Sequence, residues 1–161
     1  MTKSIEFIAT YGYLGKAPVM PGTFGTLGAI PTAWLFMQLG PVGYMVASFG
    51  FIVFSIFVAQ AYEQRSTKHD ASEVVIDEVA GALIAFTWLT SWKALLAAFL
   101  LFRALDMIKP FPINLIDKKV PGGFGVVVDD LMAGLVTSVV IQLVLAKTDW
   151  LGSPLSVTAI F

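Results

Sequence analysis

Long apolar stretches alternate with short polar segments along the chain, a pattern typical of a protein built from membrane helices. Residues 42–62 are a continuous apolar stretch of the length that crosses a bilayer as a helix. Residues 24–39 are a shorter stretch interrupted by Pro31. The Gly40–Pro41 pair between them is a turn signal, so the two stretches predict a helical hairpin. Residues 131–146, extended backwards to residue 126, predict a last membrane helix.

The apolar segment 79–102 is interrupted at Ser91–Lys93 and could form one helix or two. Basic residues stand on both sides of it: Arg65 and Lys68 before it, and Arg103, Lys109, Lys118 and Lys119 after it. Basic loop residues tend to stay on the cytoplasmic side, and a single span would place the two groups on opposite sides. Two helices, at about 74–90 and 93–108, would return the chain to one side. We therefore expect an all-α polytopic membrane protein of about five membrane helices, including this short hairpin, with its polar site at the cytoplasmic interface.

Composition refines this picture by excluding other classes of protein. Of the 161 residues, 57% are hydrophobic and 13% are charged, about half the charged fraction of a typical soluble domain. The net charge of −1 and the absence of cysteine argue against a nucleic-acid-binding protein, a disulfide scaffold and a thiol enzyme. The length fits a single domain, 1–161. The opening residues lack the pattern of a cleaved signal peptide.

Two pairs of adjacent carboxylates, Asp77–Glu78 and Asp129–Asp130, stand at the start of apolar helices. They belong to a weak internal repeat, VVIDEVAGAL at 74–83 and VVVDDLMAGL at 126–135. One acid at a helix N-terminus can simply complement the helix dipole. That does not account for two adjacent acids in both helices.

Small residues follow each acid pair at helical spacing, which suggests how the pairs could meet. The two series are Asp77, Gly81, Ala85 and Asp130, Gly134, Ser138. Stripes of small residues let membrane helices approach closely, which would bring the carboxylates to the same height. Clustered carboxylates repel unless a cation lies between them, and oxygen ligands alone suit Mg²⁺, or else Mn²⁺ or Ca²⁺. The predicted metal ligands are Asp77, Glu78, Asp129 and Asp130.

A charged cluster between the acid pairs is a candidate phosphate site. Arg103 and Asp106 share one predicted helix face, and Lys109 follows just before Pro110 and Pro112 end the helix. Arginine can bind two phosphate oxygens at once, lysine adds a point charge, and Asp106 would orient Arg103 or bind the metal. The other interpretation is a group of side chains that snorkel at the membrane interface.

A glycine-rich turn, PGTFGTLG at 21–28, is a second candidate for anion binding. At the start of a helix, Gly22 and Thr23 could donate hydrogen bonds to a phosphate. Glycine-rich turns also often serve only to let helices pack closely, so this motif by itself does not establish a phosphate site. His69, beside Asp70, could act as a base, although a solvated loop histidine is the preferred interpretation.

Together these motifs resemble the phosphatidylglycerophosphatase A family of bacterial phospholipid phosphatases. The matching blocks are PGTFGTLGAIP at 21–31, HDASEVVIDEVAG at 69–81 and FRALDMIKPFPINLIDKKVPGGFGVVVDDLMAGL at 102–135. The departures are conservative, such as Thr26 where the family has Ser. The resemblance implies a magnesium-dependent, helical inner-membrane phosphatase. Its phospholipid substrate would be phosphatidylglycerophosphate, and its products phosphatidylglycerol and phosphate.

The candidate residues can be given roles in that reaction. Asp77, Glu78, Asp129 and Asp130 would hold one or two Mg²⁺ ions, with one carboxylate as base and Asp106 in support. Arg103 and Lys109 would hold the phosphate, with Thr23 and Gly22 as further donors. With no cysteine and a single histidine, direct attack by a metal-activated water fits best, and an aspartyl-phosphate route stays open.

The competing class is a small membrane transporter or channel with an intramembrane carboxylate cation site. Its acids should be spread through the depth of several spans. Residues 79–92 and 131–146 contain none. The charges therefore gather at one end of the predicted helices, as a lipid headgroup site requires.

Overall fold

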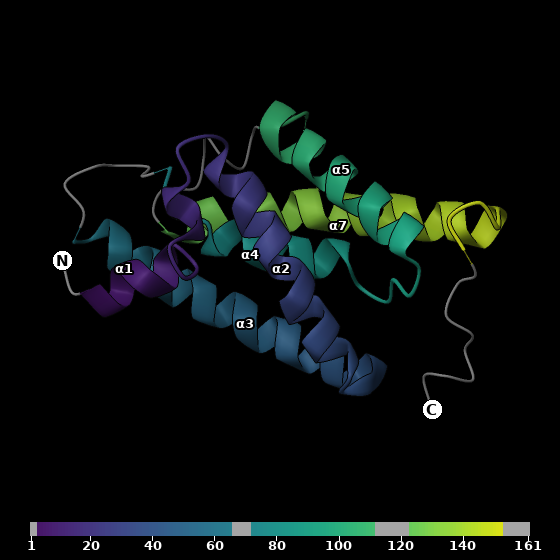
Figure 1. Ribbon diagram of the computed structural model, residues 1–161, viewed down its shortest axis with the longest axis horizontal. Helices are drawn as coiled ribbons and strands as arrows, with labels where there is room; N and C mark the ends of the chain where they lie inside the picture. The colour runs from purple at the N-terminus through teal and green to yellow at the C-terminus, as the bar shows by residue number, and fades with distance from the viewer. Residues whose placement is uncertain (1–2, 66–71, 112–122, 153–161) are drawn as a thin grey trace.

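The computed structural model describes residues 3–65, 72–111 and 123–152, and all regular structure within these ranges is helical. In chain order the elements are α1 (Lys3–Ala9), the 3-10 turn η1 (Leu14–Lys16), α2 (Pro21–Met37), α3 (Gly40–Glu63), α4 (Ile76–Ala85), α5 (Trp92–Ile108) and α7 (Gly123–Lys147). They form a bundle in which α4 lies between the longer helices (Figure 1). The predicted all-α class is confirmed.

Helices α2 and α3 form the predicted hairpin, with ends within a few residues of the two apolar stretches. The chain reverses at Gly40, whose φ of +75° lies in the left-handed region that favours glycine. Pro31 lies inside α2 without ending it. Helix α3 and residues Phe124–Lys147 of α7, 24 residues each, are long and apolar enough to cross a membrane.

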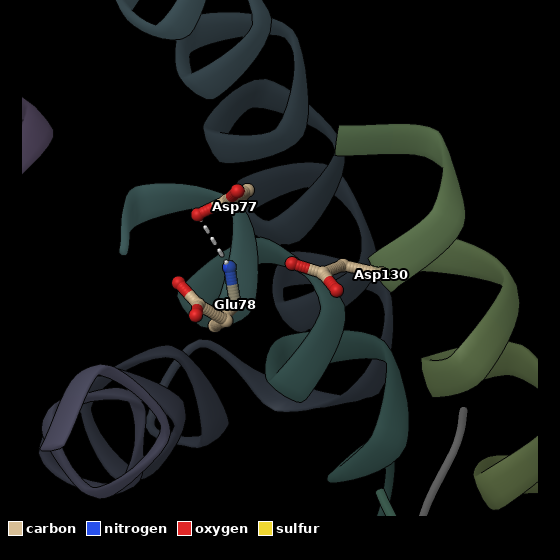
Figure 2. A group of neighbouring side chains, drawn as sticks. All are labelled: Asp77, Glu78 and Asp130. Atoms are coloured by element: carbon tan, nitrogen blue, oxygen red, sulfur yellow. Dashed lines mark hydrogen bonds between the residues drawn. The ribbon is translucent and has the colours of Figure 1, made fainter. Parts of the chain in front are cut away.

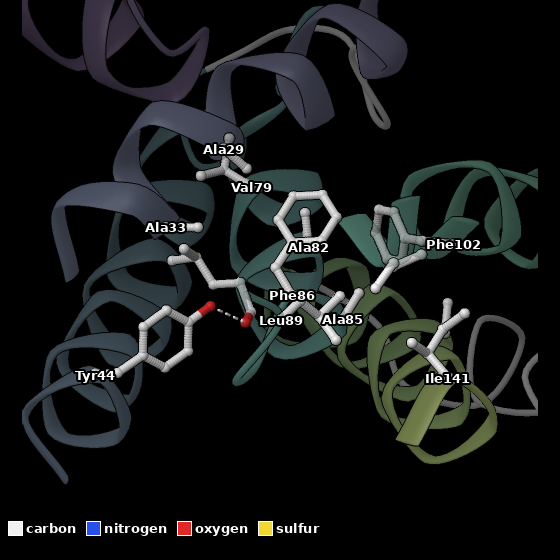
Figure 3. Close-up of a cluster of buried hydrophobic side chains, with 14 of the residues drawn as sticks. Ala29, Ala33, Tyr44, Val79, Ala82, Ala85, Phe86, Leu89, Phe102 and Ile141 are labelled. Carbon is white, nitrogen blue, oxygen red and sulfur yellow. Dashed lines mark hydrogen bonds between the residues drawn. The ribbon is translucent and has the colours of Figure 1, made fainter. Parts of the chain in front are cut away.

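Helix α4 is short and mostly buried, with eight of its ten residues shielded from solvent. It packs against α2, α3, α5 and α7, and the buried apolar side chains around it form the core (Figure 3). Its crossing with α7 is very close. A Cβ at Gly134 would collide with the carbonyl oxygen of Gly81, and a Cβ at Gly81 would lie 2.6 Å from the carbonyl oxygen of Asp130. The predicted packing along the small-residue stripes is therefore confirmed at the two glycines.

The segment 79–102 forms two helices, as predicted. Helix α4 ends at Ala85, and α5 begins at Trp92, where the Ser91 hydroxyl accepts a hydrogen bond from the backbone N–H of Lys93 at 3.3 Å. The expected length of the first helix, 74–90, was wrong. Trp88 has a φ of 59°, a left-handed conformation that a helix cannot include. At 1.5 Å per residue, α4 covers about 15 Å, half the apolar thickness of a bilayer.

The two ends of the bundle carry different side chains. Toward the left of Figure 1 lie α1, η1, the first residues of α2, α4 and α7, and the last residues of α3 and α5. Most charged residues of the described chain are at this end, which we call the charged end. The opposite end carries Lys93, Lys147 and Asp149 together with the exposed side chains of Trp34, Trp92 and Trp150. Because tryptophan is enriched where a membrane meets water, this second end has the composition of a membrane interface.

Candidate active site

Three carboxylates from α4 and α7 meet at the charged end. Asp77 and Glu78 lie in the first turn of α4, and Asp130 lies about two turns into α7. One oxygen atom from each of the three carboxylates lies within 4.8 Å of the others (Figure 2). Asp77 and Asp130 are only 5% and 4% exposed. The Oδ1 atom of Asp77 accepts a hydrogen bond from the backbone N–H of Glu78 at 3.0 Å, which orients the Asp77 carboxylate.

The glycine crossing of α4 and α7 brings these acids together. Gly81 follows Asp77 by four residues, and Gly134 follows Asp130 by four residues. Residues four apart lie on the same face of a helix. The backbones touch at the glycines, so the acids one turn earlier face the same space. This is the meeting of carboxylates that the small-residue spacing predicts.

The three carboxylates are chemically suited to a divalent cation. Buried negative charges at this separation repel one another strongly, because the protein interior screens charge poorly. The Oε2 atom of Glu78 is buried and has no hydrogen-bond partner within the described residues, so it is available to a ligand. Carboxylate oxygens are the ligands that Mg²⁺ prefers. The predicted metal ligands Asp77, Glu78 and Asp130 therefore fit a magnesium site, and the ion itself remains a prediction.

Asp129 has a different partner. Its Oδ2 atom accepts a hydrogen bond from Nζ of Lys109 at 2.5 Å, and its Oδ1 atom accepts one from the backbone N–H of Asp130 at 3.1 Å. Neighbouring residues of a helix point about 100° apart, and Asp130 is the acid of the pair that shares a helix face with Gly134 toward α4. Asp129 stands outside the group of three carboxylates. The structure thus pairs the predicted ligand Asp129 with the predicted phosphate-binding residue Lys109, and both roles remain predictions.

Arg103 and Asp106 form the predicted pair on α5. Nη1 of Arg103 lies 2.5 Å from Oδ2 of Asp106, and the two side chains are 12% and 13% exposed. The Nε atom of Arg103 is buried without a hydrogen-bond partner in the part of the chain that the structure describes. Asp106 therefore orients the guanidinium, as expected, while leaving donors of Arg103 for another group.

The first turn of α2 lies directly against Arg103 and Glu78. A Cβ added at Gly22 would lie 2.9 Å from Nη2 of Arg103 and would also collide with Oε1 of Glu78. Next to it, the Thr23 hydroxyl is buried and has no partner among the described residues. The structure thus brings the predicted phosphate-binding residues Gly22, Thr23 and Arg103 to one edge of the acid cluster. Here the glycine provides space for the arginine and the glutamate.

Some predicted features lie outside the described residues. These are His69, Asp70, Lys68, Pro112, Lys118 and Lys119.

Sequence reasoning missed two polar side chains that contact the other end of α4. The hydroxyl of Tyr44 on α3 donates to the carbonyl oxygen of Leu83, and Nε2 of Gln142 on α7 donates to the carbonyl oxygen of Thr87. A signal was available, because both are polar residues within otherwise apolar stretches, and such residues are costly in a membrane unless they have a partner.

The fold and the site together define a class: an all-helical, membrane-associated protein with a buried acidic site beside an arginine at one end. A sequence model described as Phosphatidylglycerophosphatase A matches residues 7–145. The chain belongs to this family, and the resemblance identified from its motifs is confirmed.

Two curated relatives carry that name. The Escherichia coli (strain K12) protein is 34% identical over 126 residues, which cover 77% of this chain and 73% of the relative. The Haemophilus influenzae protein is 34% identical over 124 residues, which cover 75% of this chain and 76% of the relative. No solved structure is significantly similar to the chain.

Proposed function

We propose that this protein is a phosphatidylglycerophosphatase, which hydrolyses the terminal phosphomonoester of phosphatidylglycerophosphate to phosphatidylglycerol and phosphate. Membership of the family and the names of the two relatives support this activity. The observation that carries it to particular residues is the cluster of Asp77, Glu78 and Asp130 beside Arg103. Carboxylates that can hold a cation, next to an arginine with unpaired donors, are what a dianionic phosphate requires.

In this proposal Asp77, Glu78 and Asp130 hold Mg²⁺, and Asp129 supports the site through Lys109. The cation would supply charge neutralisation and a lowered pKa for the attacking water. Arg103, oriented by Asp106, binds two phosphate oxygens, and the hydroxyl of Thr23 donates to a third. Lys109 adds positive charge while its ammonium is held by Asp129. As the water oxygen bonds to phosphorus, Oε2 of Glu78 accepts its proton, the bond between phosphorus and the glycerol oxygen breaks, and the proton passes to that departing oxygen.

We also propose that the protein is a multi-pass protein of the bacterial inner membrane with about five membrane helices and its active site at the cytoplasmic face. Among the described basic residues, Lys3, Lys16, Arg65, Arg103 and Lys109 are at the charged end, whereas only Lys93 and Lys147 are at the other. The positive-inside tendency then assigns the charged end to the cytoplasm.

Cysteine labelling tests this topology, because the natural chain has no cysteine. Ser72 and Thr90 are both exposed and flank α4 on its two sides. A Ser72→Cys variant should react with a membrane-impermeant reagent from the cytoplasmic side, and a Thr90→Cys variant from the opposite side. Labelling of both positions from the cytoplasm would contradict the hairpin arrangement of α4 and α5.

Phosphate release by the purified protein tests the activity. In detergent micelles containing phosphatidylglycerophosphate, release should require Mg²⁺ and stop on addition of a chelator. The transporter class is not favoured, because all the described acids except Asp149 gather at one end of the bundle instead of along the spans. Cation flux into proteoliposomes without phosphate release would nevertheless overturn the enzyme assignment.

A further inference from the structure

Helix α4 ends inside the apolar core. The last carbonyl groups of a helix have no partner within the helix, and in an apolar interior no water replaces them. The residues around this end are buried, including Leu83, Ala85, Phe86 and Leu89. The carbonyl oxygens of Ala82 and Ile84 accept hydrogen bonds from the backbone N–H groups of Phe86 and Thr87. The carbonyl groups of Leu83 and Thr87 instead bond to side-chain donors from other elements.

Two donors come from the two long helices that flank α4. The hydroxyl of Tyr44, on α3, donates to the carbonyl oxygen of Leu83 at 2.5 Å, and the Tyr44 side chain is fully buried (Figure 3). From α7, Nε2 of Gln142 donates to the carbonyl oxygen of Thr87 at 3.0 Å. The hydroxyl of Thr87 adds a longer, local bond to the Leu83 carbonyl at 3.4 Å. Both long-range bonds join residues far apart in the sequence and attach the end of α4 to its neighbours.

These bonds act on the same helix that carries Asp77 and Glu78. Helix α7 holds this part of the chain twice, once at the Gly81–Gly134 crossing and once, eight residues further along, through the bond from Gln142 to Thr87, two residues after α4 ends. A shift of α4 by one residue would move its acids about 1.5 Å along the axis and turn them by about 100°. Such a shift would take Asp77 and Glu78 away from Asp130.

We propose that Tyr44 and Gln142 are positioning residues: they set the register of α4 against α3 and α7 and thereby hold Asp77 and Glu78 opposite Asp130. Their bonds lie at the opposite end of α4 from Asp77 and Glu78. Their role in catalysis rests on the proposed function, whereas their role in helix register stands on the hydrogen bonds alone.

The test uses variants that remove the donor and keep the shape, Tyr44→Phe and Gln142→Met, singly and together. Matched controls remove the same groups elsewhere. Tyr11→Phe removes a hydroxyl that contacts Thr32, and Gln38→Met removes an amide that donates to the Trp34 carbonyl at 3.2 Å near the end of α2. Neither control residue bonds to α4.

The first measurement is Mn²⁺ binding to the full-length protein in detergent, followed by electron paramagnetic resonance. We expect the double variant to bind Mn²⁺ at least about tenfold more weakly, the loss typical of residues that orient metal ligands. Its phosphate release should fall at low Mg²⁺ and recover at high Mg²⁺, with an unchanged KM for lipid. The controls should match the natural protein. Should the double variant fail to fold, the single variants are expected to show the same changes at smaller size.

The second measurement reads the register without a metal. Ala80 on α4 and Val127 on α7 belong to one small buried cluster, so cysteines at these positions report the alignment of the two helices through the yield of the disulfide that forms directly between them on oxidation, which is the crosslink measured here. We expect a lower yield in the Tyr44→Phe, Gln142→Met background. Natural Mn²⁺ affinity together with a natural yield would overturn the proposal, as would equal losses in the control variants. If the natural protein binds no Mn²⁺, the metal site of the proposed function fails, and the crosslink yield decides the register.

Discussion

The two ends of α4 meet the apolar interior in opposite ways. At its first turn, Asp77 and Glu78 face Asp130, so three carboxylates are held together. At and just beyond its last turn, neutral donors from Tyr44 and Gln142 bond to the carbonyl groups of Leu83 and Thr87. One end has its hydrogen-bond partners within the protein, and the other carries the acids to which the proposed function assigns a cation. The proposed catalytic acids and the bonds that hold the other end of α4 thus lie on opposite sides of a helix of 10 residues.

The largest effect should follow from breaking the acidic end. Asp77→Asn or Asp130→Asn should lower turnover by at least about a thousandfold, or roughly 4 kcal/mol of transition-state stabilisation, because each removes a charged ligand. Neither change should lower the thermal stability measured in chelator, since an amide relieves the repulsion among buried acids. Asp149→Asn, at the opposite end, serves as the control and should be silent. Retention of activity in both variants would remove the acids from the site.

Mg²⁺ should raise the free energy of unfolding of the protein through the three carboxylates at the first turn of α4. At a Mg²⁺ concentration about a hundredfold above its dissociation constant, the free energy of unfolding should rise by about 2.7 kcal/mol. Asp130→Asn should abolish most of this gain, whereas Gln38→Met, which touches neither end of α4, should keep it. Thermal unfolding with and without Mg²⁺ measures the difference. An equal gain in both variants would place the cation elsewhere.

A methyl group at the glycine crossing should disturb the acids from the middle of α4. Gly134→Ala would force its Cβ against the carbonyl oxygen of Gly81, which should cost about 1–3 kcal/mol of stability and lower activity. Gly50→Ala is the matched control. Gly50 lies within α3 with nothing described within 4 Å of its added Cβ, so this change should be neutral or stabilising by up to about 1 kcal/mol. Denaturation and phosphate release of the two variants would show whether the crossing matters.

The smallest effect on activity should come from a conservative change at Arg103, the α5 residue that lies beside the acids. Arg103→Lys keeps the charge and loses the two-point contact with phosphate. It should lower kcat/KM by about tenfold, or roughly 1.4 kcal/mol. Lys147→Ala, at the far end of α7, should have no measurable effect on phosphate release. Equal effects of the two changes would indicate general membrane electrostatics instead of a phosphate site.

Much of the fold could be predicted because apolar stretches, turn residues and basic loops are local signals. The hairpin at Gly40 and the division of 79–102 into two helices follow from such signals. The length of α4 could not be predicted, since Thr87, Trp88 and Leu89 are as compatible with a helix as their neighbours. The helix ends there because Trp88 is left-handed and the nearby carbonyls find partners on α3 and α7.

The amino-acid sequence by itself determined the class, the family and the residue types of the site, because paired acids and small-residue stripes in apolar helices leave few interpretations. It also determined that α4 and α7 would meet at their glycines. The small-residue spacing already placed Asp77 and Asp130 on the facing surfaces, and only the tertiary structure decided that Glu78 joins them and that Asp129 pairs with Lys109. Asp130 turns toward α4 and Asp129 toward Lys109, because consecutive helical residues point about 100° apart. The rotation of α7 about its own axis, set by packing along its whole length, selects between them.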